Sequence, residues 1–287
     1  MMRPWQILGC AISAAALSSS AQAHADSLKA FSVPFELYKG HIYVHAFVNG
    51  QGPYRFVFDT GASGIGRADT RLVKELSLRV TGQEQNSDGI NVAPITMVAA
   101  DSVRLGGLEK RDVTLASRDY NVNRKPSEAP VMGIIGRDFF KERLLTIDYP
   151  ARKIILSRGS LSARQRGVVA YKPSFSIPVC FKAGCFEGEV DSGSNRSLII
   201  PKALVGLVEA SAPVRIGSGT SANTSFELYE MQLAQPVRIS GVTATNQKIL
   251  YSEPSDDTIN IGSDFLKDYV LTIDQRHRLL RISKPKR

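Results

Sequence analysis

Two aspartates stand where a carboxyl group could perform acid–base chemistry. Asp59 lies in RFVFDTGASG and Asp191 lies in FEGEVDSGSN, each after an apolar or valine-bearing run. A buried carboxylate must be paired, hydrogen-bonded or kept neutral. If the two loops meet, the pair shares one proton, because like charges a few ångströms apart do not both ionise readily. One carboxyl group would then take a proton from a water molecule while the other donates one.

The residues that follow each aspartate favour such a meeting. Glycine at positions 61 and 193 lets the backbone turn tightly and approach a neighbour. Thr60 and Ser192 supply hydroxyl groups that can tie one loop to the other. The alternative is two unrelated turns, in which each aspartate binds only its own backbone.

An internal repeat gives the chain two equivalent halves. Residues 136–157, GRDFFKERLLTIDYPARKIILS, and residues 262–283, GSDFLKDYVLTIDQRHRLLRIS, are identical at ten of 22 positions without a gap. Each copy lies downstream of one Asp-Thr/Ser-Gly segment. We therefore expect an N-terminal lobe at 26–161 with Asp59, and a C-terminal lobe at 162–287 with Asp191.

The elements that position these loops are predicted to be mainly strands. Residues 41–48 and 54–59 alternate or run apolar, and NGQG between them predicts a hairpin. Residues 68–78 have helical spacing. The segments GRDFFKERL and GSDFLKDYV predict short helices that Asp138 and Asp264 cap. The predicted fold class is mainly β, with two closed β lobes related by a pseudo-twofold axis.

Together, FDTGAS and VDSGSN, followed by GIIGRDF and NIGSDF, resemble the aspartic peptidases of the pepsin and retropepsin type. The resemblance covers nearly all of the chain after its first 25 residues. The Gly-x-Asp-Phe segments are similar to the retropepsin-like halves found in bacterial exported proteins. The resemblance implies a bilobal aspartic-protease fold and water-mediated peptide hydrolysis, with no metal, no other cofactor and no covalent intermediate. It implies catalytic roles for two residues and supporting roles for five, namely Asp59 and Asp191, then Thr60, Gly61, Ser192, Gly193 and Ser194.

Three departures from this family pattern are visible. Position 62 is alanine, where pepsin-like enzymes usually have a hydroxyl that bonds the adjacent aspartate, whereas Ser194 keeps that donor. Fewer donors to the ionised form raise the pKa of a carboxyl pair, so we expect an activity optimum nearer neutral pH than that of an acid protease. Asn260 replaces an apolar residue, which predicts either a local hydrogen bond or slight repacking.

The third departure concerns the flap, a hairpin that covers the site in this family. The candidate flap is 84–94, with Asp88, Gly89 and Ile90 at its tip, and it lacks the tyrosine of pepsin-like flaps. Gly89 would permit a mobile tip. The mirrored segment 217–226 predicts a second, flap-like loop.

The first 25 residues predict a cleaved signal peptide. Arg3 precedes a short apolar run from Ile7 to Leu17, and small residues lead to Ala25. A lipoprotein with lipidated Cys10 is a disfavoured alternative, because the apolar run continues past that cysteine. No later run reaches the roughly 18 apolar residues of a membrane span, so we expect no stable membrane insertion. The predicted location is the periplasm or the exterior of the cell.

Cys180 and Cys185 in VCFKAGCF predict a hairpin disulfide in an oxidising compartment, with free thiols as the alternative. The net charge of +9 comes from alternating basic and acidic positions, which indicates a solvated basic surface. No basic-aromatic array favours nucleic acid. His41 and His45 flank a strand without an obvious third ligand, so we expect solvated histidines and no metal site.

These patterns together predict an exported aspartic endopeptidase whose partner is a polypeptide substrate in an extended conformation. We expect a monomer, because one chain supplies both aspartates. The alternative is a catalytically silent peptide-binding or scaffold protein on the same fold.

Overall fold

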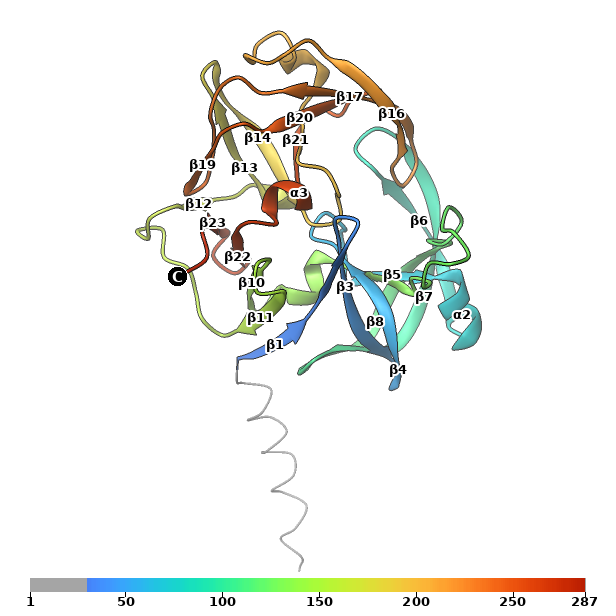
Figure 1. The fold of residues 1–287 in the computed structure, drawn as a ribbon. Coiled ribbons are helices and arrows are strands. Elements are labelled where there is room, and N and C mark those ends of the chain that lie inside the picture. Colours follow the sequence, from blue (N-terminus) through green and yellow to red (C-terminus); the bar gives the residue numbers. More distant parts are fainter. Residues whose placement is uncertain (1–29, 287) are drawn as a thin grey trace, which may run out of the picture.

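The computed structural model describes residues 30–286. The predicted signal peptide at 1–25 and the lipidation alternative at Cys10 lie outside these residues. Strands predominate between residues 30 and 286, and the helices there are few and short, which confirms the predicted mainly β, bilobal fold (Figure 1).

The first half of the chain forms an eight-stranded sheet in the order β2-β3-β4-β9-β5-β8-β7-β6. The β3–β4 hairpin is the one predicted from NGQG. Helix α2 (Thr70–Glu75) is shorter than the predicted 68–78. It begins after Asp69, which caps it by accepting a hydrogen bond from the Arg71 amide at 2.9 Å. The strands are β2 (Glu36–Tyr38), β3 (His41–Val48), β4 (Gln51–Phe58), β5 (Gly66–Asp69), β6 (Arg79–Ser87), β7 (Val92–Leu105), β8 (Leu108–Arg118) and β9 (Gly133–Ile135).

The second half forms a nine-stranded sheet in the order β16-β17-β20-β15-β21-β14-β13-β18-β19. Short 3-10 helices, η2 (Pro173–Phe175) and η3 (Lys202–Leu204), lie between its strands. The strands are β13 (Ser176–Phe181), β14 (Gly184–Asp191), β15 (Leu198–Ile199), β16 (Val214–Thr220), β17 (Ser225–Gln232), β18 (Val237–Ile239), β19 (Val242–Ala244), β20 (Lys248–Glu253) and β21 (Ile259–Gly262).

A third sheet of six strands joins the halves, in the order β1-β11-β10-β22-β23-β12 (Figure 1). At its centre β10 pairs with β22, and Thr146 lies opposite Thr272, its own counterpart in the repeat. The flanking pairs follow the same symmetry, so the pseudo-twofold axis passes between these threonines. The strands are β1 (Phe31–Pro34), β10 (Leu144–Asp148), β11 (Lys153–Ser157), β12 (Val168–Ala170), β22 (Val270–Asp274) and β23 (Leu279–Ser283).

The segment 158–167 joins β11 to β12 and contains no strand. The lobe boundary between residues 161 and 162 lies in this segment and stays a prediction.

Both predicted helices after the repeated glycine are present, as the 3-10 helix η1 (Arg137–Phe140) and the helix α3 (Ser263–Leu266). The prediction that Asp138 and Asp264 cap them is wrong. The N-cap residue in each is the glycine, without a side-chain hydrogen bond, and Asp264 instead pairs with Lys267 at 2.7 Å.

Buried aromatic side chains fix these helices against the sheet. Phe58 of β4 is fully buried, and its ring centroid lies 4.7 Å from that of Phe140 in η1. Burying a side chain of this size stabilises the fold by roughly 1.5–3 kcal/mol. None of the helices between residues 30 and 286 is long and apolar enough to span a bilayer.

Candidate active site

Asp59 stands at the end of β4, and a neighbouring strand fixes its backbone. β9 runs parallel to β4, with Phe58 opposite Ile135, and the Asp59 amide donates to the Ile135 carbonyl at 3.0 Å. Asp191 ends β14 in the same way, opposite Gly262 of the parallel strand β21. Each aspartate is thus presented by a rigid strand of its own half.

Thr60 and Ser192 join the two loops by reciprocal hydrogen bonds. The Ser192 amide donates to Thr60 Oγ1 at 2.9 Å, and the Thr60 amide donates to Ser192 Oγ at 3.0 Å. Each hydroxyl donates in turn to a carbonyl of the opposite half, Thr60 to Val190 at 2.9 Å and Ser192 to Phe58 at 3.0 Å. Both side chains are fully buried, where a lost partner is costly, so this network holds the halves together.

The glycines of the two loops lie under the opposite carboxyl groups. A Cβ at Gly61 would stand 2.5 Å from Asp191 Oδ1, and a Cβ at Gly193 would collide with the carboxyl group of Asp59. Only glycine therefore permits this approach. The structure brings Asp59 and Asp191 face to face.

The surroundings of Asp59 favour its neutral form. Burial and the negative charge of Asp191 raise the pKa of Asp59 well above its usual value, and a hydrogen bond between the two side chains adds to the rise. The Gly61 and Ala62 amides oppose it by donating to Asp59 Oδ1 at 2.8 and 3.1 Å. The pair can therefore hold a proton at pH values where an exposed aspartate is ionised.

Asp191 has a donor on each oxygen. The Gly193 amide donates to Oδ1 at 2.8 Å, and Asn260 Nδ2 donates to Oδ2 at 2.8 Å. The sequence predicted that the Ser194 hydroxyl would be the side-chain donor to Asp191. In the structure Ser194 Oγ lies beside Gly262, where it would contact a Cβ at that position. Of the two outcomes expected for Asn260, the structure shows the local hydrogen bond.

The Gly-x-Asp-Phe segments clamp the loop that follows each aspartate. A Cβ at Gly136 would lie 2.6 Å from the Gly64 carbonyl oxygen, and the amides of Arg137 and Asp138 donate to the carbonyls of Ala62 and Gly64, each at 3.0 Å. The second half repeats these bonds, from Ser263 N to Ser194 O at 2.8 Å and from Asp264 N to Arg196 O at 3.1 Å. The repeat therefore serves to position the two loops.

His41 is a residue that sequence reasoning placed wrongly. Its ring is largely buried beside the second loop, with a backbone hydrogen bond to Gly193. Burial lowers the pKa of His41, and the negative charge of Asp191 opposes that shift. Strand alternation puts residues 41 and 45 on one face, but only His45 is exposed, because the second half covers the start of β3.

Glu189 is a third carboxyl group near the pair that sequence reasoning missed. It lies two residues before Asp191 on β14, so strand alternation puts both side chains on one face. Burial and the charge of Asp191 raise the pKa of Glu189 to about 7, against the opposing effect of Arg137. Arg137 Nη1 of the first half lies 3.4 Å from Glu189 Oε1.

The candidate flap forms the tip of the β6–β7 hairpin, with Gly89 at φ 90°. Asp88 Oδ1 accepts the amides of Ile90 and Asn91 at 3.2 and 2.8 Å. A Cβ at Gly89 would collide with the side chain of Asp256 in the second half. The predicted second loop is the tip of the β16–β17 hairpin.

These two tips, residues 86–91 and 221–224, contact each other, and we refer to them as the hairpin clasp. Asp88 Oδ2 accepts hydrogen bonds from Ser221 Oγ and, at 2.7 Å, from the Asn223 amide. Asn223 Nδ2 donates to the Asn86 carbonyl at 2.7 Å, and Asn91 Nδ2 donates to Thr224 Oγ1 at 2.9 Å. The clasp therefore links the two halves a second time.

The predicted disulfide between Cys180 and Cys185 is present. These residues face each other across the β13–β14 hairpin. The bond secures the strand that ends in Asp191.

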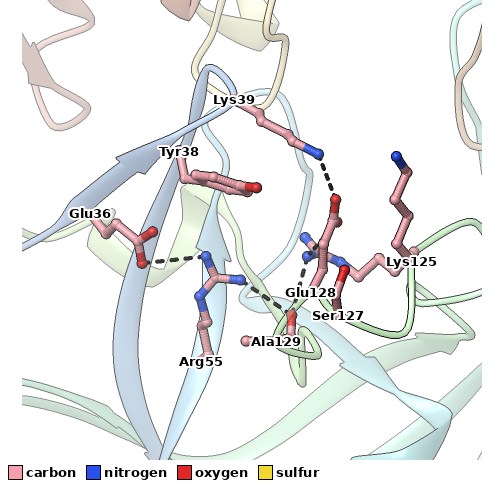
Figure 2. A pocket seen from close by; sticks show the side chains of 9 residues that line it. Glu36, Tyr38, Lys39, Arg55, Lys125, Ser127, Glu128 and Ala129 are labelled. Carbon is pink, nitrogen blue, oxygen red and sulfur yellow. Dashed lines mark hydrogen bonds and ion pairs between the residues drawn. The ribbon is translucent and has the colours of Figure 1, made fainter.

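A separate pocket of about 440 Å³ lies between the β2–β3 hairpin and the loop at 124–129 (Figure 2). Three of its four cationic side chains are already paired, as Lys39–Glu128 at 2.5 Å, Arg55–Glu36 at 3.3 Å and Arg124–Glu128 at 3.6 Å. Neither aspartate of the pair lines it. Within residues 30–286 no cluster of His, Cys, Asp and Glu could hold a metal ion.

Comparison with known families agrees with the geometry of the first half. Residues 44–139 match a family model described as aspartyl protease, and this match covers Asp59 and the segment up to Phe139, about a third of the chain. No curated protein matches the chain. The match supports a protease of the aspartyl type, which acts on polypeptides.

Proposed function

We propose that this protein is an exported aspartic endopeptidase, which hydrolyses peptide bonds with a water molecule activated between Asp59 and Asp191. One observation carries the proposal: two partly buried carboxyl groups from equivalent loops face each other at the contact between the halves. The aspartyl protease match at 44–139 supports it independently.

The reaction needs one proton on the pair. One carboxylate takes a proton from water as the water oxygen bonds to the peptide carbonyl carbon, and the other carboxyl group protonates the carbonyl oxygen. The resulting diol then collapses. The first group gives its proton to the amide nitrogen, the second recovers a proton from a diol hydroxyl, and the C–N bond breaks. The pair ends with its single proton restored.

An extended polypeptide is the substrate that suits this arrangement. In the proposed complex it lies between the carboxyl pair and the hairpin clasp, with alternate side chains directed to opposite sides. The clasp is adjacent to the first aspartate loop, since Arg67 contacts both the Ser63 carbonyl at 3.1 Å and Asn86 Oδ1 at 3.4 Å. The clasp must open to admit substrate.

The disulfide between Cys180 and Cys185 supports the proposed export, because such bonds persist in oxidising compartments. A signal peptide at 1–25 and a periplasmic or secreted location are part of the same proposal. One chain carries both aspartates, which supports a monomeric enzyme.

The proposal predicts that Asp59→Asn and Asp191→Asn each lower kcat for an unstructured peptide by at least about 10²–10⁴-fold, since each removes one proton-transfer group. The measurement is mass-spectrometric detection of cleavage products, with and without an aspartic-protease transition-state inhibitor. Asp101→Asn is the matched control, because Asp101 is exposed on β7, and it should keep full activity.

Cleavage that persists in both active-site variants would reject the assignment. Tight peptide binding without turnover in the wild type would favour the peptide-binding alternative instead. Circular dichroism of each variant shows whether the fold is retained.

A further inference from the structure

The two members of the carboxyl pair receive their hydrogen bonds differently. Both donors to Asp59 bind the same oxygen, Oδ1, and both are backbone amides. Asp191 instead accepts one backbone amide on Oδ1 and one side-chain amide, that of Asn260, on Oδ2. Within residues 30–286, Asp59 Oδ2 accepts no such amide hydrogen bond. The Ala62 amide has no counterpart at Asp191, because Ser194 N donates to the Asp191 backbone carbonyl at 3.3 Å. Among the described residues, the one side-chain amide that donates to either carboxyl group is that of Asn260.

The repeat explains why only one half supplies this donor. Asn260 lies opposite Glu189 in the parallel pair β14–β21, and its counterpart Ile134 lies opposite Val57 in the pair β4–β9. The two positions are equivalent in register, so both side chains approach their own aspartate from the neighbouring strand. Isoleucine has no polar atom to donate.

The orientation of the Asn260 amide is determined by the carboxylate. Its Nδ2 points to Asp191 at 2.8 Å, because turning the amide over would put two oxygens face to face. The cost is visible at the other end, where Asn260 Oδ1 is buried without a partner among the described residues. A buried unsatisfied acceptor is destabilising, so the hydrogen bond to Asp191 is kept at some cost to the stability of the fold.

We propose that Asn260 is a positioning residue that makes the pair asymmetric, so that Asp191 is the ionised base towards water and Asp59 carries the shared proton as the acid. This assignment rests on the proposed function for its chemical meaning. A hydrogen bond to a carboxylate stabilises the charged form, and only Asp191 has one on its second oxygen. The elevated pKa of Asp59, caused by burial and by Asp191, agrees with this division.

Other charged or titratable groups also face the pair and must be separated from the effect of Asn260. They come from β3, the loop after β8, the β10–β11 turn and β14, and are His41, Tyr120, Tyr149 and Glu189, the last paired with Arg137 of η1. Glu189 lies opposite position 260 in register, so its surroundings change with a substitution there, whereas the other four residues are not strand partners of that position. Single-aspartate backgrounds isolate its action.

The test is a titration of the aspartate carboxyl carbons by ¹³C NMR, without substrate. In the Asp59→Asn background, Asn260→Ile should raise the pKa of Asp191 by about 1–2 units, the equivalent of a charged hydrogen bond worth about 1.5–3 kcal/mol. In the Asp191→Asn background, the same substitution should leave the pKa of Asp59 unchanged. If the Asn260→Ile variant does not fold, Asn260→Leu serves as the second variant.

The repeat also offers a matched control. Ile134→Asn combined with Asn260→Ile moves the donor to the first half, and should lower the pKa of Asp59 in the Asp191→Asn background. In the enzyme with both aspartates, Asn260→Ile should shift the acidic limb of the kcat/KM profile to higher pH by about one unit, because the base is then harder to ionise.

An unchanged Asp191 titration in Asn260→Ile would overturn the inference, as would an equal shift of both aspartates. The titration is independent of turnover. Absence of peptidase activity with the predicted pKa shifts would therefore reject the proposed function alone, whereas activity without those shifts would reject only the role of Asn260.

Discussion

Asp59 and Asp191 can approach each other because the opposite loop has no side chain where each carboxyl group lies. A Cβ on Gly61 would meet Asp191, and a Cβ on Gly193 would meet Asp59. Thr60 and Ser192, which stand between the aspartate and the glycine of each loop, form hydrogen bonds with each other across the halves. Three consecutive residues thus provide a carboxyl group, a link between the halves and the space for the opposite carboxyl group.

Glu189 adds a further charge to this region, where its counterpart in the first half is Val57. Its pKa of about 7, against an ordinary 4.5, results from burial and from Asp191, with Arg137 in opposition. Because the unfolded chain releases this proton first, Glu189 stabilises the fold fully below pH 4.5, and that contribution is lost as pH rises through about 7.

We expect Glu189→Gln to flatten the pH dependence of stability between pH 4.5 and 7, the window set by these two pKa values. The free energy of unfolding of the wild type should fall across this window by roughly 1–3 kcal/mol more than that of the variant. Urea unfolding at pH 4.5, 6 and 7.5 measures the difference. Glu84→Gln, at an exposed position on β6, is the control. Identical slopes for wild type and Glu189→Gln would contradict the assignment.

At the scale of elements, the hairpin clasp depends on one carboxylate. Asp88 uses Oδ1 to form its own turn and Oδ2 to bind the opposite tip. Burial raises the pKa of Asp88, but hydrogen bonds from Ser221, Asn91 and Asn223 outweigh it and lower that pKa below its ordinary value. The clasp should therefore stay closed down to a pH below that at which an exposed aspartate is protonated.

Asp88→Ala should open the clasp, because it removes an acceptor that both tips share. Amide exchange at 86–91 and 221–224 should accelerate by roughly 10- to 100-fold, the effect of losing a few hydrogen bonds of about 1 kcal/mol each. Hydrogen–deuterium exchange with mass spectrometry measures this. Thr220→Val, exposed beside the clasp, should leave exchange unchanged. Unaltered exchange in Asp88→Ala would mean that the tips meet for other reasons.

At the scale of the whole molecule, three groups of contacts between the halves join segments that are far apart in sequence. The six-stranded sheet pairs β10 with β22, the Thr60–Ser192 network ties the loops, and the hairpin clasp joins the tips. The first two contacts follow the pseudo-twofold axis. They fix the orientation in which both carboxyl groups face one site.

Thr60→Val and Ser192→Ala should each lower the free energy of unfolding by about 1–3 kcal/mol, because each leaves buried partners unsatisfied. The double variant should cost less than the sum of the two, with a coupling of roughly 0.5–3 kcal/mol, since both act in one network. Denaturant unfolding of the wild type, both single variants and the double variant completes this double-mutant cycle. Thr114→Val, exposed on β8, should change stability by no more than about 0.5 kcal/mol. Strict additivity would show that the two hydroxyls act separately.

Local patterns were sufficient for much of this protein. Period-two apolar runs and turn residues predicted the strands and the mainly β class, and a six-residue hairpin segment predicted the Cys180–Cys185 bond. The repeat predicted two equivalent halves, because ten shared positions in 22 report the same local structure twice. The paired Asp-Thr/Ser-Gly segments indicated which loops to examine, and their catalytic role remains the proposal.

Only the tertiary structure decided which side chains touch between segments that are far apart in the sequence. Asn260 looked like a misplaced polar residue, and its bond to Asp191 joins positions 69 apart. His41 looked solvated until the second half covered it. Such contacts depend on how distant segments pack, within one half for Asn260 and between the halves for His41. That packing is determined by shape and by buried hydrogen bonds, for which a local sequence pattern carries no signal.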